Sequence, residues 1–136
     1  MGGTTLCSNC CRCAVQPFNT NQVLYCPMMD ARRMEVYCLV ADAASNILEE
    51  AHAHVVTEHR FLEWLDQSKV LFFGDGAAKC KPILAHHRHA IFIADIYPSA
   101  QQIGVLAYAY FQQNKFVDIN SFSPQYLKPF YSSMTQ

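Results

Sequence analysis

The 136-residue sequence has little charge, since Asp, Glu, Lys and Arg together make up only 15% of it. Ten basic residues against eleven acidic ones leave a formal net charge of -1. The chain therefore has no overall positive field with which to hold a polyanion. We expect no strong direct binding of nucleic acid by this chain alone.

Long apolar runs are also missing. No stretch approaches the ~20 apolar residues that a membrane-spanning helix needs, and the N-terminus lacks the basic and apolar regions of a signal peptide. We therefore expect a cytoplasmic protein that does not associate with membranes. Hydrophobic residues nevertheless make up 51% of the sequence, which excludes disorder for most of it and predicts one domain around one core.

Seven cysteines are present, but their spacing does not suit a disulfide framework. Four crowd together near the N-terminus, and three stand singly in apolar segments. An odd count with isolated members is typical of a reducing compartment, where buried thiols behave as small hydrophobes. We expect no structural disulfides and predict that Cys26, Cys38 and Cys80 are buried and unpaired.

The chain changes character at residue 23. Residues 1–22 show neither helical nor strand periodicity, and we interpret them as an irregular tail, either frayed or non-native. From residue 23 onward, alternating and fully apolar runs predict strands, and apolar residues spaced three and four apart predict helices. The predicted strands cover 23–29, 34–42, 47–56, 70–74 and 90–94, and the predicted helices cover 58–67, 77–85 and 99–114.

Two residues are predicted to begin helices as N-caps, Thr57 for the first and Ser99 for the last. The resulting order is βββ-α-β-α-β-α, which predicts an α/β (α+β) fold. An antiparallel meander leads into parallel strands joined by crossover helices, in one mixed five-stranded sheet. This is the order of the ribonuclease H-like unit, which actin-like ATPases use twice per molecule.

Four segments make the prediction more specific, at residues 26–37, 71–81, 95–108 and 123–130. Together they resemble the second lobe of the TsaB (YeaZ) family. In that family a D-A-R-x-x-E-V-Y turn, a glycine-rich strand end, a P-x-A helix start and a P-x-Y-L-[RK] tail occur in this order. The matching residues outside the glycines are Asp30, Ala31, Arg32, Glu35, Val36, Tyr37, Pro98, Ala100, Pro124, Tyr126, Leu127 and Lys128.

The resemblance runs from about residue 14 to the end. The family's D-T-S opening and its G-P-G-S-[FY]-T-G-[LI]-R segment, both from the first lobe, do not occur in the sequence. The chain therefore resembles the C-terminal lobe with the N-terminal lobe missing. We assign residues 23–136 to that second lobe, and a frameshifted or misassigned start would account for the unmatched residues before it.

The resemblance implies a function in making N6-threonylcarbamoyladenosine at position 37 of tRNA. Proteins similar to this one are non-catalytic components that act with the TsaD transferase and with TsaE. By resemblance the chain is then not an enzyme, has no catalytic residue and takes no cofactor. Because the resemblance implies that the family's main pairing helices belong to the absent lobe, we expect the contact of this truncated piece with a TsaD-like protein to be weakened or lost.

An alternative from another class is a metal-dependent hydrolase of the "glycoprotease" type, or a metal-binding protein. Structural zinc sites usually take two separated cysteine pairs, so we interpret the cramped N-terminal cluster as part of the tail. Stoichiometric zinc or iron in the purified protein would favour the alternative. The four cysteines of the cluster are Cys7, Cys10, Cys11 and Cys13.

Histidines form the second metal-like pattern. In His86-His87-Arg88-His89, at a predicted strand start, only His87 and His89 could share an ion, because consecutive strand residues point to opposite faces. We interpret this segment as a polar loop. His52 and His54 share one strand face without a third ligand nearby, and we interpret them as residues of the sheet surface.

Two turns carry the remaining candidate residues. Gly74, Asp75 and Gly76 lie between a strand and a helix, where backbone N–H groups can face a phosphate. We favour a tight turn that needs a positive φ. At the 30–35 turn we expect Asp30 to accept backbone N–H bonds and Arg32 to bridge to Glu35, with partner contact as the alternative.

The resemblance implies that the last predicted helix has an apolar face which, in the family's two-lobe arrangement, turns toward the first lobe and loses part of its partner here. An exposed stripe of that size exceeds what monomers usually tolerate. We therefore expect a homo-oligomer that uses this helix. The stripe consists of Ile103, Leu106, Ala107, Tyr110 and Phe111.

Overall fold

The computed structural model describes residues 23–44, 46–97, 99–123 and 127. Several of the sequence-based predictions fall outside these residues. They are the irregular tail 1–22 with its four clustered cysteines, and the motif residues Pro98, Pro124, Tyr126 and Lys128.

Five strands form one mixed sheet in the order β3-β2-β1-β4-β5. The pairs β1–β2 and β2–β3 are antiparallel, whereas β1–β4 and β4–β5 are parallel. The strands are β1 (Val23–Asp30), β2 (Glu35–Ala41), β3 (Ile47–Val55), β4 (Lys69–Phe73) and β5 (Ala90–Ile93). The helices are α2 (Leu62–Gln67), α3 (Ala77–Leu84) and α4 (Ala100–Gln112).

The predicted α/β fold is confirmed, with a meander followed by two parallel strands and the order βββ-α-β-α-β-α. The predicted start of the first helix is wrong. Helix α2 begins at Leu62 after the N-cap residue Phe61, so Thr57 is not its cap. Instead the Thr57 carbonyl accepts the Arg60 N–H at 3.3 Å and begins a tight turn.

The main core lies between the sheet and the two helices α2 and α3, which cover the same face of it. Phe61 and Leu65 at α2 and Leu84 of α3 are fully buried there against the strands. Phe72 of β4 packs edge-on against Phe61, with ring centroids 5.3 Å apart. The strand residues of this core are Cys26, Met28, Val36, Cys38, Val40, Val70 and Phe72.

The opposite face of the sheet carries a second group of buried side chains. In its central strands Val23, Tyr25, Leu71 and Phe73 pack together. Strands that are buried on both faces have nearly continuous apolar sequences, and β4 (KVLFF) has such a sequence.

Three predicted buried thiols are found as expected. Cys26, Cys38 and Cys80 are each at most 1% exposed and none is in a disulfide. Burial raises the pKa of the Cys26 thiol well above its usual value and raises that of Cys80 to about 12. These two thiols are therefore protonated and unreactive at neutral pH.

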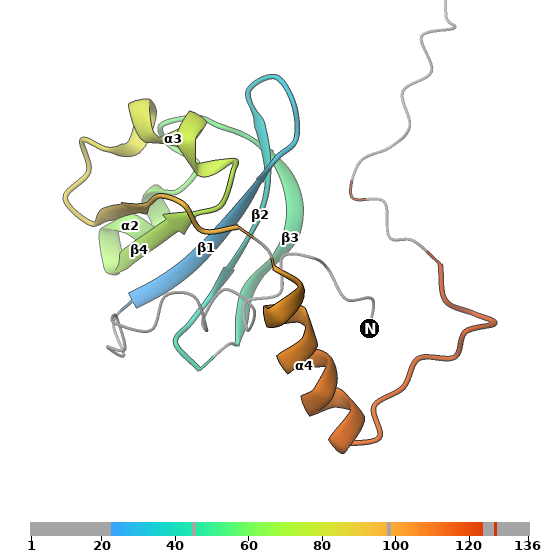
Figure 1. Cartoon of the computed structure of the whole chain (residues 1–136). Helices are drawn as coiled ribbons and strands as arrows, with labels where there is room; N and C mark the ends of the chain where they lie inside the picture. The colour runs from blue at the N-terminus through green and yellow to red at the C-terminus, as the bar shows by residue number, and fades with distance from the viewer. Residues whose placement is uncertain (1–22, 45, 98, 124–126, 128–136) are drawn as a thin grey trace, which may run out of the picture.

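Helix α4 points away from the sheet (Figure 1). The predicted cap is confirmed, because the Ser99 hydroxyl accepts the Gln102 N–H and the Gln102 side chain accepts the Ser99 N–H, both at 3.3 Å. None of the α4 residues is buried. Among the described residues, no helix is both long enough and apolar enough to cross a membrane.

Candidate functional site

The glycine turn, residues 74–76, lies directly against the end of β1. Gly74 has φ +95°, and a Cβ added there would stand 2.3 Å from the Met28 carbonyl oxygen. The Gly76 N–H donates to that same oxygen at 3.1 Å. A side chain at Gly76 would meet the Met29 carbonyl carbon at 2.8 Å. Both glycines are thus required by the close approach of two backbones.

Asp75, the middle residue of the glycine turn, faces the same strand. Its Oδ1 accepts the Asp30 N–H at 3.2 Å. The turn therefore directs one N–H and one carboxylate at β1. A carboxylate in this position disfavours a phosphate, because like charges repel. The geometry of residues 74–76 therefore fits the interpretation as a tight turn better than the interpretation as a phosphate-binding turn.

A lysine joins α3 to the β1–β2 turn. Lys79 of α3 donates from Nζ to Asp30 Oδ1 at 2.6 Å, to the Arg33 carbonyl at 2.8 Å and to the Glu35 carbonyl at 3.3 Å. The three N–H donors of an ammonium group thus have three acceptors. The hydrogen bond from Lys79, followed by one from the Arg32 N–H, lowers the pKa of Asp30 below its usual value.

The β1–β2 turn adopts a left-handed backbone at Arg32 (φ +67°) and Arg33 (φ +49°). Asp30 Oδ1 accepts the Arg32 N–H at 2.6 Å, as the sequence predicted. An ion pair at this turn joins Asp30 to Lys79, and the bridge from Arg32 to Glu35 stays a prediction. We call the assembly of Asp30, Asp75 and Lys79 the junction.

The other described motif residues differ in their surroundings. Ala31 and Val36 are buried, and Val36 belongs to the main core. Tyr37 packs on the opposite face with Leu39 and Ala41. Ala100 begins α4, and Leu127 is half-buried.

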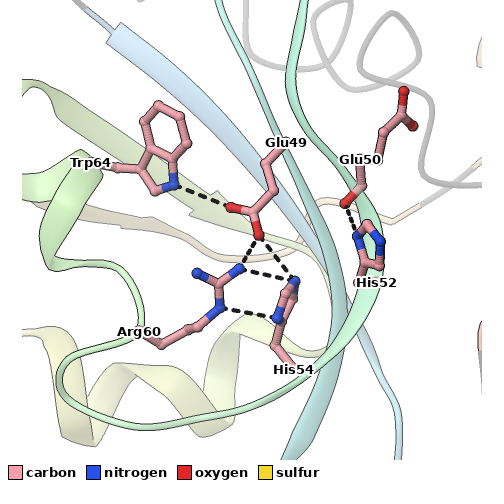
Figure 2. Close-up of polar contacts among 6 residues, drawn as sticks. All are labelled: Glu49, Glu50, His52, His54, Arg60 and Trp64. Atoms are coloured by element: carbon pink, nitrogen blue, oxygen red, sulfur yellow. Dashed lines mark hydrogen bonds and ion pairs between the residues drawn. The ribbon is translucent and has the colours of Figure 1, made fainter.

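A second polar group, which the sequence did not indicate, lies at the β3 edge of the sheet (Figure 2). We call Glu49, His54, Arg60 and Trp64 the edge cluster. Glu49 accepts from the Arg60 guanidinium through Oε1 and from the Trp64 indole N–H through Oε2 at 3.2 Å. Arg60 Nε donates to His54 Nδ1 at 2.9 Å.

A β-bulge brings Glu49 and His54 to the same face. Val40 of β2 pairs with Glu49, whereas Cys38 pairs with His52, so β3 holds one extra residue over this interval. In a regular strand, residues five apart point to opposite faces. Simple alternation therefore placed Glu49 away from the histidines and missed the cluster.

The edge cluster surrounds the His54 ring. Arg60 contacts both ring nitrogens, with Nε donating to Nδ1 at 2.9 Å and Nη2 lying 3.2 Å from Nε2, which is also 3.3 Å from Glu49 Oε1. Burial, with a smaller effect of His52, lowers the pKa of His54 below its usual 6.5. Since Glu49 is already paired with Arg60, it is a poor general base. The cluster holds the segment before α2 against β3 and offers no free proton acceptor.

The histidine segment 86–89 forms the loop between α3 and β5. His89 Nδ1 lies 2.6 Å from the Leu65 carbonyl, and His87 Nε2 lies 3.6 Å from Asp66 of α2. The centroids of the His87 and His89 rings are 5.7 Å apart. Both rings contact residues of α2 and so attach the loop to that helix. Within the described part of the chain, no group of three His, Cys, Asp or Glu residues could hold a metal ion.

Comparison with known proteins supports the fold. No protein-family model matches the chain, and no curated protein matches it. A solved structure from Pseudomonas aeruginosa, described as an uncharacterized protein with similarity to peptidase YEAZ, matches with a TM-score of 0.67 at 17% sequence identity. The match covers 90% of this chain and 56% of the Pseudomonas chain. At this identity the likeness shows a YeaZ-like fold.

Proposed function

We propose that the chain is a TsaB-like, non-catalytic component of the machinery that makes N6-threonylcarbamoyladenosine at position 37 of tRNA. Its partner in this proposal is a TsaD-like transferase, supported by a TsaE-like protein. The observation that carries the proposal is the likeness to the YEAZ-similar structure, which covers 90% of this chain at a TM-score of 0.67. The chain spans little more than half of that protein, so the proposed role is that of one lobe.

The structure of the candidate residues supports a role without catalysis. At the junction, Lys79 is bonded to three acceptors and Asp75 to the β1 backbone. In the edge cluster, the carboxylate and the imidazole are both bonded to Arg60. General acid–base catalysis needs a group that is free to take a proton from a substrate, and these residues are used for holding the fold together.

Depletion of the protein in its native cell tests the proposal. We expect the threonylcarbamoyl-modified adenosine in total tRNA, measured by mass spectrometry of nucleosides, to fall and to return when the intact gene is supplied. A copy carrying Gly74→Ala, which should fold poorly, is expected not to restore it. An unchanged level of the modified nucleoside after depletion would contradict the proposal.

Metal analysis of the purified protein distinguishes this proposal from the alternative of a metal-dependent hydrolase. The proposal expects sub-stoichiometric zinc and iron in protein purified without a tag. One equivalent of either metal per chain would favour a metalloprotein.

A further inference from the structure

Helix α4 presents an apolar surface to solvent over its whole length. Ile103 is 50% exposed, Tyr110 43% and Phe111 61%. Phe116, just after the helix, is 67% exposed and extends the surface, because its ring packs edge-on against Phe111 at 5.8 Å. We call these four residues, with Leu106 and Ala107 between them, the α4 stripe.

An isolated helix like α4 needs a packing partner to be stable. Helices shorter than roughly 12–15 residues are marginal in water, and α4 has 13 residues with Gly104 near its middle. No charged side chain lies between Ala100 and Gln112, so the helix gains nothing from charge pairs along its surface. Its stability must come from covering the stripe.

The area of the stripe suits a second copy of the same chain. At about 200 Å² for a whole aromatic side chain, the exposed parts of Tyr110, Phe111 and Phe116 provide roughly 350 Å². The aliphatic members raise this to roughly 500 Å² per copy, or about 1,000 Å² for two, which is the lower bound of specific interfaces. Self-pairing also brings few like charges together, because α4 itself has no charged residue and Lys115, with Nζ 5.9 Å from the centroid of the Tyr110 ring, lies at one end of the stripe.

We propose that two copies of the chain associate through their α4 stripes, with the helices packed antiparallel about a twofold axis. Such an interface is closed, since the same patch is used on both copies. Its area lies at the low end of interface sizes, where weak and transient complexes are found. The proposal rests on the exposure of α4 and does not depend on the function proposed above.

Sedimentation velocity of the full chain tests the proposal. A reducing agent is added so that no disulfide-linked dimer forms. Between about 1 and 100 µM we expect the sedimentation coefficient to rise from the monomer value to the dimer value. The double variant Ile103→Glu/Phe111→Glu, which places two carboxylates in the stripe, should weaken dimerisation at least tenfold, because burying unpaired charges is costly.

A matched control lies on the opposite side of the same helix. Val105 and Tyr108 are 59% and 64% exposed, so Val105→Glu/Tyr108→Glu also replaces one β-branched and one aromatic residue by glutamate. It should leave the dimer intact. A wild-type chain that stays monomeric at 100 µM, even if a TsaD-like protein binds the stripe, would overturn the proposal. So would equal weakening by the two double variants.

Discussion

At Gly74 the backbone leaves no room for a side chain. Its φ of +95° and the distance of 2.3 Å from an added Cβ to the Met28 oxygen exclude a side chain. We expect Gly74→Ala to lower the free energy of unfolding by roughly 3 kcal/mol or more, because strain and a steric clash act together. Urea denaturation followed by circular dichroism measures this.

Gly104 provides the control for that substitution. Nothing lies within 4 Å of a Cβ added there, and α4 is not packed into the core. Gly104→Ala should therefore leave the urea midpoint unchanged or raise it slightly, since alanine favours a helix by about 1 kcal/mol over glycine. If both substitutions lowered the free energy of unfolding equally, the close approach of Gly74 to Met28 could not be the cause of the loss.

His54 gives the chain a pH-dependent contribution to stability. Its folded pKa lies below the usual 6.5 because of burial, so the unfolded chain binds more protons than the folded one as the pH falls through 6.5. The contribution is therefore fully present above pH 6.5 and is lost as the pH falls through the folded pKa. Protonation at Nδ1 would also remove the acceptor for Arg60 Nε.

We expect the urea midpoint to fall between pH 7.5 and pH 5.5, and to fall less in His54→Gln. The control His59→Gln changes an exposed histidine near the same segment and should keep the wild-type dependence. If His54→Gln kept the full dependence, the pH effect would have to come from another group.

At the scale of elements, Lys79 joins α3 to the β1–β2 turn and so connects parts of the chain that are 49 residues apart. Lys79→Met keeps most of the aliphatic chain but removes the donors for one carboxylate and two carbonyls. We expect a loss of about 1–2 kcal/mol in the free energy of unfolding, moderated because Asp30 is partly exposed.

Lys81→Met is the comparison for this substitution, because it removes an exposed lysine from the same helix. It should change the free energy of unfolding by no more than about 0.5 kcal/mol. Guanidinium denaturation of both variants at one pH provides the measurement. A loss at Lys81 equal to that at Lys79 would contradict the role we assign to the junction.

Some helices and strands could be predicted from the sequence alone, and others could not. Strands β1, β4 and β5 and the cap of α4 depend on local apolar runs and on a Ser-x-x-Gln capping box, which can be read directly. Helix α2 begins after Phe61 and not after Thr57, and the edge cluster depends on a bulge in β3. Alternation along one strand contains no sign of a bulge, because the extra residue is defined only against the partner strand.

At the scale of the whole molecule, the order of elements predicted the sheet. A meander followed by two strands with crossover helices has few possible arrangements, and the structure has the predicted one. The candidate site was less predictable. Asp30 was recognised from its turn, but Lys79 was not, because nothing local marks a lysine on one helix as the partner of a distant turn.

At this scale, the junction and the edge cluster contrast with helix α4. The junction and the edge cluster each leave their carboxylates paired, whereas α4 leaves a large apolar surface uncovered. The proposed dimer depends on this exposed surface of α4.

Titration of the purified chain against the TsaD-like protein of the same cell, followed by isothermal calorimetry, tests the proposed function most directly. We predict a one-to-one complex with a dissociation constant on the order of 10 µM, weak because the chain spans little more than half of the YEAZ-similar protein. The absence of binding at about 100 µM of both proteins would contradict the proposed partnership.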